Sequence, residues 1–220
     1  MTHNKIKNTL VFVVLVMIIF FNSSKIQAQI TGQKIGFYGV IDERFDIDLI
    51  GEMAAARPEW NIMLIGPVVK IDPATLPRHA NIHYLGPKSY EELPRYLSGW
   101  DVALVPFLLN DSTKFISPTK TPEYLAAGKP VVSSAIKDVI NPYGKQNLVS
   151  IANNTAEFIG AIEAYLNFTD KTEWLSKVDK FLLTNSWDYT CSDMAELMSI
   201  AFADRKVLKM PLNNLSAIGG

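Results

Sequence analysis

Six short apolar runs recur along this chain, separated by segments with a helical pattern. Both faces of each run are apolar, which is typical of strands buried in a parallel sheet with helices on either side. The sequence therefore predicts an α/β fold, a doubly wound parallel sheet of the Rossmann-like kind. The runs cover residues 34–39, 61–66, 81–86, 101–107, 130–134 and 147–151.

Polar residues in front of the helical segments predict where those helices begin. Asp46 precedes an apolar-periodic stretch as an N-cap does, and Ser89 and Glu92 have the spacing of a capping box. Asn154 or Thr155 is expected to cap the helix after the sixth run.

The first 28 residues are of another kind, because a basic start is followed by an unbroken apolar run at residues 10–21. This pattern predicts a secretory signal peptide, and the run is short for a membrane span of about 20 residues. An uncleaved anchor stays open as an alternative. The chain is then exported or membrane-associated, and an anchor would place it on the cytoplasmic face. We expect one domain over residues 29–204 and a flexible tail over 205–220.

Composition excludes several classes of function. The formal net charge of −1 provides no basic excess, so we expect no nucleic-acid partner. One cysteine, Cys191, rules out an internal disulfide framework and most metal clusters. We expect no metal site and no cofactor, and we expect Cys191 to be a small buried residue on a helix.

Three of the apolar runs end in glycine, at Gly39, Gly66 and Gly86. Sheets of this type bind ligands beyond the carboxyl ends of their strands, where the backbone has to turn or approach something closely. The simpler alternative is that each of them is only a turn glycine.

The segment SPTKTPEYLAAGKPVV, residues 117–132, lies at the same edge of the predicted sheet. Thr121 is the expected N-cap of a short helix, with Pro122 at its first position and Gly128 as its stop. Ser117, Thr119 and Lys120 would then surround the start of that helix.

These groups suit an anion, and phosphate is the usual one. Glu123 does not suit a phosphate, but its carboxylate can accept hydrogen bonds from a ribose diol. Phosphate and sugar side by side predict a nucleotide. The alternative is a capped helix in which Glu123 serves only its own helix dipole.

Residues 34–166 resemble the C-terminal, nucleotide-sugar-binding domain of glycosyltransferase family 4 type enzymes, which have the two-domain GT-B fold. The resemblance rests on IGFYGVIDERFDIDLI, on NIHYLGPKSYEELPRYLSGWDVALVPF and on PEYLAAGKPVV. GVIDER, SPTKTPEYLAAGKPVV and SWDYT are similar to a bacterial subgroup that includes teichuronic acid biosynthesis glycosyltransferases.

The resemblance implies roles for single residues. Glu123 matches the glutamate that binds the donor ribose, whereas Phe115 stands where the other glutamate of that family would be. Val40 replaces an arginine that contacts the diphosphate, which leaves Arg44 and Lys120 as the predicted basic partners. The predicted nucleotide-sugar site is Gly39, Arg44, Ser117, Thr119, Lys120 and Glu123.

A GT-B enzyme also has an N-terminal domain that holds the acceptor, and the sequence shows only the signal-like segment in that position. The first hypothesis is therefore a UDP-hexose-binding half of a glycosyltransferase of cell-surface polysaccharide synthesis, completed by another domain or a separate acceptor-binding chain. The second is a non-catalytic remnant, and the third is an exported interaction module on the same scaffold. The sequence offers no candidate catalytic base.

Overall fold

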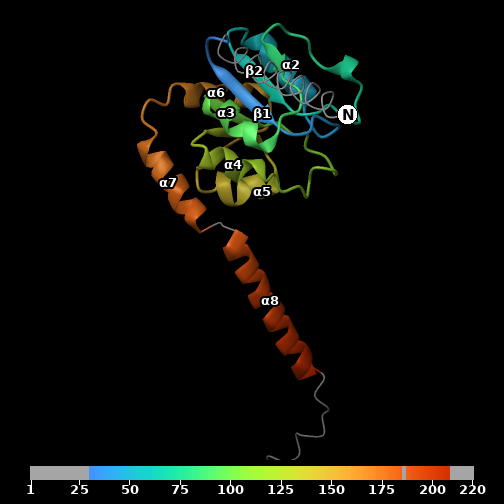
Figure 1. The fold of residues 1–220 in the computed structure, drawn as a ribbon, viewed down its shortest axis with the longest axis vertical. Helices are drawn as coiled ribbons and strands as arrows, with labels where there is room; N and C mark the ends of the chain where they lie inside the picture. Colours follow the sequence, from blue (N-terminus) through green and yellow to red (C-terminus); the bar gives the residue numbers. More distant parts are fainter. Residues whose placement is uncertain (1–29, 185–186, 209–220) are drawn as a thin grey trace, which may run out of the picture. The chain divides into compact units, whose positions relative to one another are not determined.

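The computed structural model describes residues 30–184 and 187–208, and Figure 1 shows the order of the elements. Its strands are β1 Lys34–Tyr38, β2 Asn61–Ile65, β3 Ile82–Tyr84, β4 Val102–Val105, β5 Val131–Ser134 and β6 Ser150–Ala152. Its α-helices are α2 Ile47–Ala56, α3 Leu93–Ser98, α4 Lys120–Ala126, α5 Lys137–Val139, α6 Thr155–Leu166, α7 Thr172–Leu183 and α8 Trp187–Leu208.

All six strands belong to one sheet, in the order β3-β2-β1-β4-β5-β6, and every neighbouring pair is parallel. The predicted doubly wound, Rossmann-like sheet is confirmed. The strand order reverses between β1 and β4, and ligands bind at such a switch point in open α/β sheets. The carboxyl ends of these two strands are therefore the first place to look for a site.

The sixth strand is shorter and later than the apolar run predicts. Leu148 and Val149 are buried, but pairing with β5 begins only at Ser150. Asn147 has a positive φ of 56°, so the chain turns there and enters the sheet after the run has started.

The predicted helix starts are confirmed in α2 and α6 and in the turn before α3. Asp46 accepts a backbone hydrogen bond as the N-cap of α2, and Ser89 and Glu92 form a capping box. Asn154, rather than Thr155, caps α6.

The two faces of β1 pack on different aromatic clusters. The ring of Phe37 contacts Phe45 and Phe107, with ring centroids 4.8 and 6.0 Å away. The next residue, Tyr38, contacts Tyr124 of α4 at 4.9 Å and Trp100 at 6.4 Å. Since consecutive side chains of a strand point to opposite faces, Phe107 and Tyr124 mark opposite faces of the sheet.

Backbone hydrogen bonds continue the sheet beyond the ends of β1 and β2. The amide of Gly39 donates to Ile65 at 2.8 Å, and the amide of Gly66 donates to Gly86 at 3.0 Å. A Cβ added at Gly66 would lie 1.8 Å from the carbonyl oxygen of Gly39. Gly66 is thus required by the close approach of the Gly39 backbone.

Packing divides the chain into two units, one ending at Leu175 and the other beginning at Ser176. In the second unit, α8 exposes Cys191, so the expectation that this cysteine is buried is wrong. The helix also carries several large exposed apolar side chains, at Tyr189, Met194, Leu197, Met198, Ile200 and Phe202.

The predicted leader, residues 1–28, lies outside the described residues, as does most of the predicted tail. No helix among residues 30–184 and 187–208 has the length and hydropathy that a bilayer crossing requires.

Candidate functional site

The start of α4 differs from the sequence-based expectation. The helix begins at Lys120 with Thr119 in the N-cap position, so the prediction of Thr121 as the N-cap is wrong. The amide of Thr121 already donates to the carbonyl of Pro118 at 3.2 Å, and the Thr121 side chain is fully buried. A side chain that points into the interior cannot turn back to cap its own helix.

Lys120 passes directly over Gly39 at the end of β1. A Cβ built on Gly39 would lie 2.3 Å from Cε of Lys120 and 3.0 Å from its Nζ. Gly39 also has a φ of +147°, which residues with a side chain rarely adopt. The absence of a side chain at Gly39 is what lets the ammonium group reach the edge of the sheet.

Gly39→Ala is expected to lower the free energy of unfolding by about 1–3 kcal/mol, because it strains the backbone and displaces Lys120. Urea unfolding would measure the loss. Gly160→Ala in α6 is the matched control, since no atom lies within 4 Å of the added methyl. That substitution should be neutral or stabilising by about 0.5–1 kcal/mol. Equal effects at both glycines would contradict the assignment.

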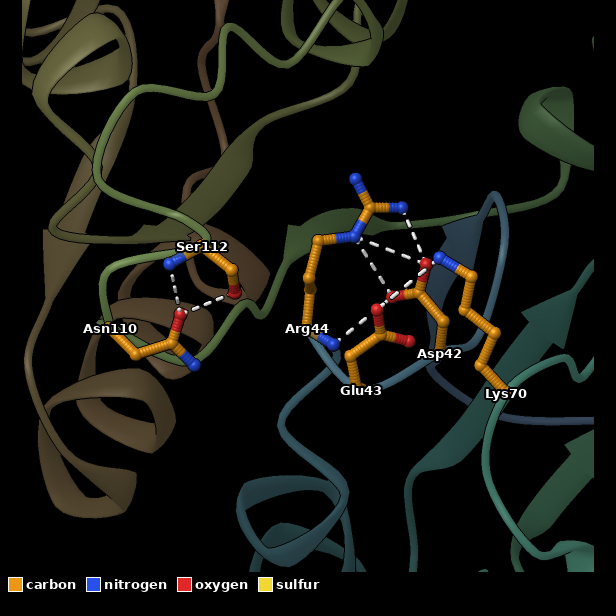
Figure 2. Close-up of polar contacts among 6 residues, drawn as sticks. All are labelled: Asp42, Glu43, Arg44, Lys70, Asn110 and Ser112. Atoms are coloured by element: carbon orange, nitrogen blue, oxygen red, sulfur yellow. Dashed lines mark hydrogen bonds and ion pairs between the residues drawn. The ribbon is translucent and has the colours of Figure 1, made fainter.

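Arg44 is bound to Asp42 in the loop between β1 and α2. Its Nη2 lies 2.5 Å from Oδ2 of Asp42, and its Nε lies 3.0 Å from Oδ1. Figure 2 shows the guanidinium bending back toward Asp42, beside Glu43 and Lys70. Burial alone would raise the pKa of Asp42, but hydrogen bonds from Arg44 bring that pKa below its ordinary value. Nη1 of Arg44 takes no part in this pairing.

Glu123 lies one turn into α4 and accepts a hydrogen bond from the hydroxyl of Tyr38. Tyr38 is in turn anchored by its backbone amide, which donates to the hydroxyl of the buried Tyr124 at 3.0 Å. Burial, with the hydrogen bond to Glu123, raises the pKa of Tyr38 far above its ordinary value, so this hydroxyl stays a donor. Sequence reasoning missed Tyr38. Its place at the end of β1, directly before Gly39, was the available signal.

Lys120, Glu123, Arg44 and Asp42 form one electrostatic group. The pKa of Lys120 is below its ordinary value, and burial is the largest cause. The charges of Glu123 and Asp42 act to raise this pKa, whereas the charge of Arg44 acts to lower it. Within the described residues, the ammonium of Lys120 has no hydrogen bond and no ion pair. The arrangement presents a partly buried cation without a direct hydrogen bond or ion pair among the described residues, next to a carboxylate that Tyr38 holds in place.

The remaining predicted residues lie on the loop before α4. Ser117 and Thr119 are exposed, and Thr119 occupies the N-cap position without a side-chain cap hydrogen bond. Phe115 is 79% exposed in the same loop. The structure therefore brings Gly39, Lys120 and Glu123 together, leaves Arg44 paired with Asp42, and leaves the hydroxyls of Ser117 and Thr119 open to solvent.

Among the residues that the structure describes, no group of three or more His, Cys, Asp or Glu residues is placed to hold a metal ion. His83 lies within β3 and is hydrogen-bonded to Asn61 at 3.1 Å. Burial lowers its pKa, which favours a neutral structural histidine.

The sequence profile described as "Glycosyl transferases group 1" matches residues 32–168. TuaH of Bacillus subtilis (strain 168), named as a teichuronic acid biosynthesis glycosyltransferase, is 26% identical over 163 residues. The match covers 71% of this chain and 41% of TuaH. The chain thus spans less than half the length of this relative.

Solved structures show the same fold. HepE of Anabaena, in complex with UDP-glucose, aligns with a TM-score of 0.59 at 14% identity, over 80% of this chain and 52% of HepE. Sucrose-phosphate synthase from Thermosynechococcus elongatus aligns with a TM-score of 0.58 at 17% identity, over 83% of this chain and 49% of the synthase. The resemblance to GT-B glycosyltransferases is confirmed for family and fold, and the chain belongs to the group 1 glycosyltransferases.

Proposed function

We propose that this domain binds the nucleotide of a UDP-hexose at the carboxyl edge of its sheet. It would serve as the donor-binding half of a glycosyltransferase in cell-surface polysaccharide synthesis. The observation that carries the proposal is the Lys120 ammonium, which is partly buried and lacks a hydrogen-bonded partner among the described residues, beside the Tyr38–Glu123 pair. A diphosphate supplies the missing anion, and a ribose diol supplies the donors that a carboxylate accepts.

Each residue has a role in this proposal. Lys120 contacts the diphosphate, and the missing side chain of Gly39 leaves room for the Lys120 stem at the edge of the sheet. Glu123 accepts from the ribose, with Tyr38 as a positioning residue. Arg44 can offer Nη1 to a phosphate while Nε and Nη2 stay hydrogen-bonded to Asp42. Ser117 and Thr119 offer exposed hydroxyls on the loop that precedes Lys120.

The comparisons support the donor and the setting of the reaction. HepE has been solved with UDP and with UDP-glucose, and TuaH is named for teichuronic acid biosynthesis. Transfer also requires an acceptor hydroxyl held about 3–3.5 Å from the reacting carbon. Since this chain spans about half of HepE, we assign the rest of the cleft to a further domain or a partner chain.

The test is an NMR titration of the full chain with UDP, UDP-glucose and pyrophosphate. UDP is expected to shift the amide signals of Gly39, Lys120 and Glu123, with a dissociation constant near or below about 1 mM. Lys145→Met is a charge-matched control, because Lys145 is exposed and precedes β6 at the opposite edge of the sheet. Absence of any shift at about 5 mM UDP would refute nucleotide binding. Binding without transfer in the complete assembly would favour the non-catalytic hypothesis.

A further inference from the structure

A separate cavity of about 380 Å³ opens at the carboxyl edge of the sheet. It lies beyond the ends of β4, β5 and β6, between the first turns of α2 and α6. Phe107 lines it, and Phe107 packs on the face of β1 that is opposite to Tyr38 and Tyr124. The cavity is therefore on the other face of the sheet from Glu123.

The wall of the cavity is continuous with the loop that carries Arg44. The amide of Leu108 donates to the carbonyl of Arg44 at 2.8 Å, and the amide of Asp46 donates to Pro106 at 2.9 Å. The segments 44–46 and 106–108 thus run side by side.

The cavity combines an apolar floor with a rim of hydrogen-bond acceptors. Phe107 and Phe158 are buried beneath it, and Leu109 is exposed at its side. The carboxylates of Asp48 and Glu52 stand on the exposed side of α2. Its lining residues include no lysine, arginine or histidine. The two carboxylates and the absence of a basic side chain in the lining favour an uncharged ligand over a phosphate or a carboxylate.

Ser134 adds an unsatisfied hydroxyl at the floor. Its side chain lines the cavity and is 95% buried, with a relative exposure of 5%. The neighbouring Ser133 donates to the carbonyl of Ser134 at 2.9 Å, but the hydroxyl of Ser134 has no hydrogen bond with any described residue. The Ser134 oxygen is not among the fully buried polar atoms without a partner in the described residues, so it keeps some solvent access, and a ligand or water in the cavity can bond to it.

We infer that this cavity holds an uncharged pyranose ring of a saccharide other than the donor. The inference rests on the proposed function, since the saccharide would be an outlying sugar unit of a polysaccharide acceptor whose reacting end the further domain or partner chain holds. A pyranose has an apolar face for Phe107 and Leu109 and hydroxyl donors for Asp48 and Glu52. The Ser134 hydroxyl can donate to or accept from a sugar oxygen at the floor. The volume lies in the range of small-molecule sites, about 300–1,000 Å³.

The test is an NMR titration of the full chain with methyl α-glucopyranoside and methyl α-galactopyranoside, with and without saturating UDP. At least one glycoside should shift the amides of Leu49, Leu109 and Thr155 with a millimolar dissociation constant, and UDP should leave that constant unchanged. UDP itself should shift Gly39 and Lys120 instead. If UDP caused no shift but a glycoside did, the proposed nucleotide site would be refuted and the glycoside site would not.

Variants separate a built site from a nonspecific contact. Asp48→Asn with Glu52→Gln should raise the glycoside dissociation constant about tenfold, because two charged acceptors are lost. Ser134→Ala, which removes only the hydroxyl, should weaken binding by a similar factor. The control is Glu91→Gln, an exposed carboxylate outside the cavity, which should have no effect.

Three outcomes would overturn the inference. The first is no shift of these amides at about 100 mM glycoside. The second is a shift with UDP-glucose but not with either free glycoside, which would make the ring part of the donor. The third is a shift of these amides with methylammonium but with neither glycoside, which would make the cavity a cation site.

Discussion

Lys120→Met is expected to stabilise the ligand-free chain and, in the same variant, to weaken UDP binding about 10–100-fold. Burial lowers the pKa of Lys120, so its charged form is less favourable in the folded state than in the unfolded state. Methionine keeps the apolar stem beside Gly39 and removes the charge. The melting temperature of the ligand-free protein should rise by roughly 1–3 °C, a modest change because the side chain is partly exposed.

The pH dependence has a definite sign. Because the pKa of Lys120 is below its ordinary value of 10.5 in the folded protein, the unfolded state binds more protons in the window between the two values. Stability from this group should rise with pH through that window, and the rise should be lost in Lys120→Met. Calorimetric melting at a series of alkaline pH values up to the ordinary value of 10.5 would measure it.

Lys145→Met is again the control, with the same change in charge at an exposed position. It should alter neither the affinity for UDP nor this pH dependence. A Lys120→Met protein that melts at a lower temperature and binds UDP as tightly as the original would contradict both parts of the prediction.

Glu123→Gln should weaken the binding of UDP by about 1.5–3 kcal/mol, or roughly 10–100-fold, and should leave the binding of pyrophosphate nearly unchanged. The carboxylate is assigned to the ribose, which pyrophosphate lacks. The glutamine can still accept a hydrogen bond from Tyr38, so the melting temperature should change little. Isothermal calorimetry with the two ligands makes the comparison directly.

Tyr38→Phe tests the positioning role separately. Removing the Tyr38 hydroxyl leaves the Glu123 carboxylate charged but no longer held in place. The affinity for UDP should therefore fall by a smaller factor, roughly 3–10-fold. Pyrophosphate again should not respond. If Glu123→Gln weakened both ligands equally, Glu123 would serve only the dipole of its helix, and the ribose assignment would be wrong.

Much of the fold was predictable from the sequence because it depends on local patterns. Apolar runs on both strand faces, with helical segments between them, predict a parallel sheet, and all six strands are present. Asp46 and the Ser89–Glu92 box mark helix starts because their hydrogen bonds involve only neighbouring residues. Glu123 and Lys120 were recognisable as candidates because they are charged residues at a strand-to-helix connection.

The start of α4 was not predictable in this way. A threonine before a proline is a good local N-cap, but Thr121 is buried and the helix begins at Lys120. Burial depends on what packs above a residue, and local sequence does not contain that information. Cys191 shows the opposite error, because a small apolar residue that was expected to be buried is exposed in the structure.

The sequence alone determined the sheet, the glycines at its edge and the identity of the charged residues near them. Only the tertiary structure decided which groups meet. Tyr38 reaches Glu123 across 85 positions in the chain, and Lys120 reaches Gly39 because β1 and β4 are neighbours in the sheet. Asp42 takes one edge of Arg44, and Ser134 turns its hydroxyl to the cavity face. The physical reason is that hydrogen bonding and burial act through space, whereas periodicity and capping act along the chain.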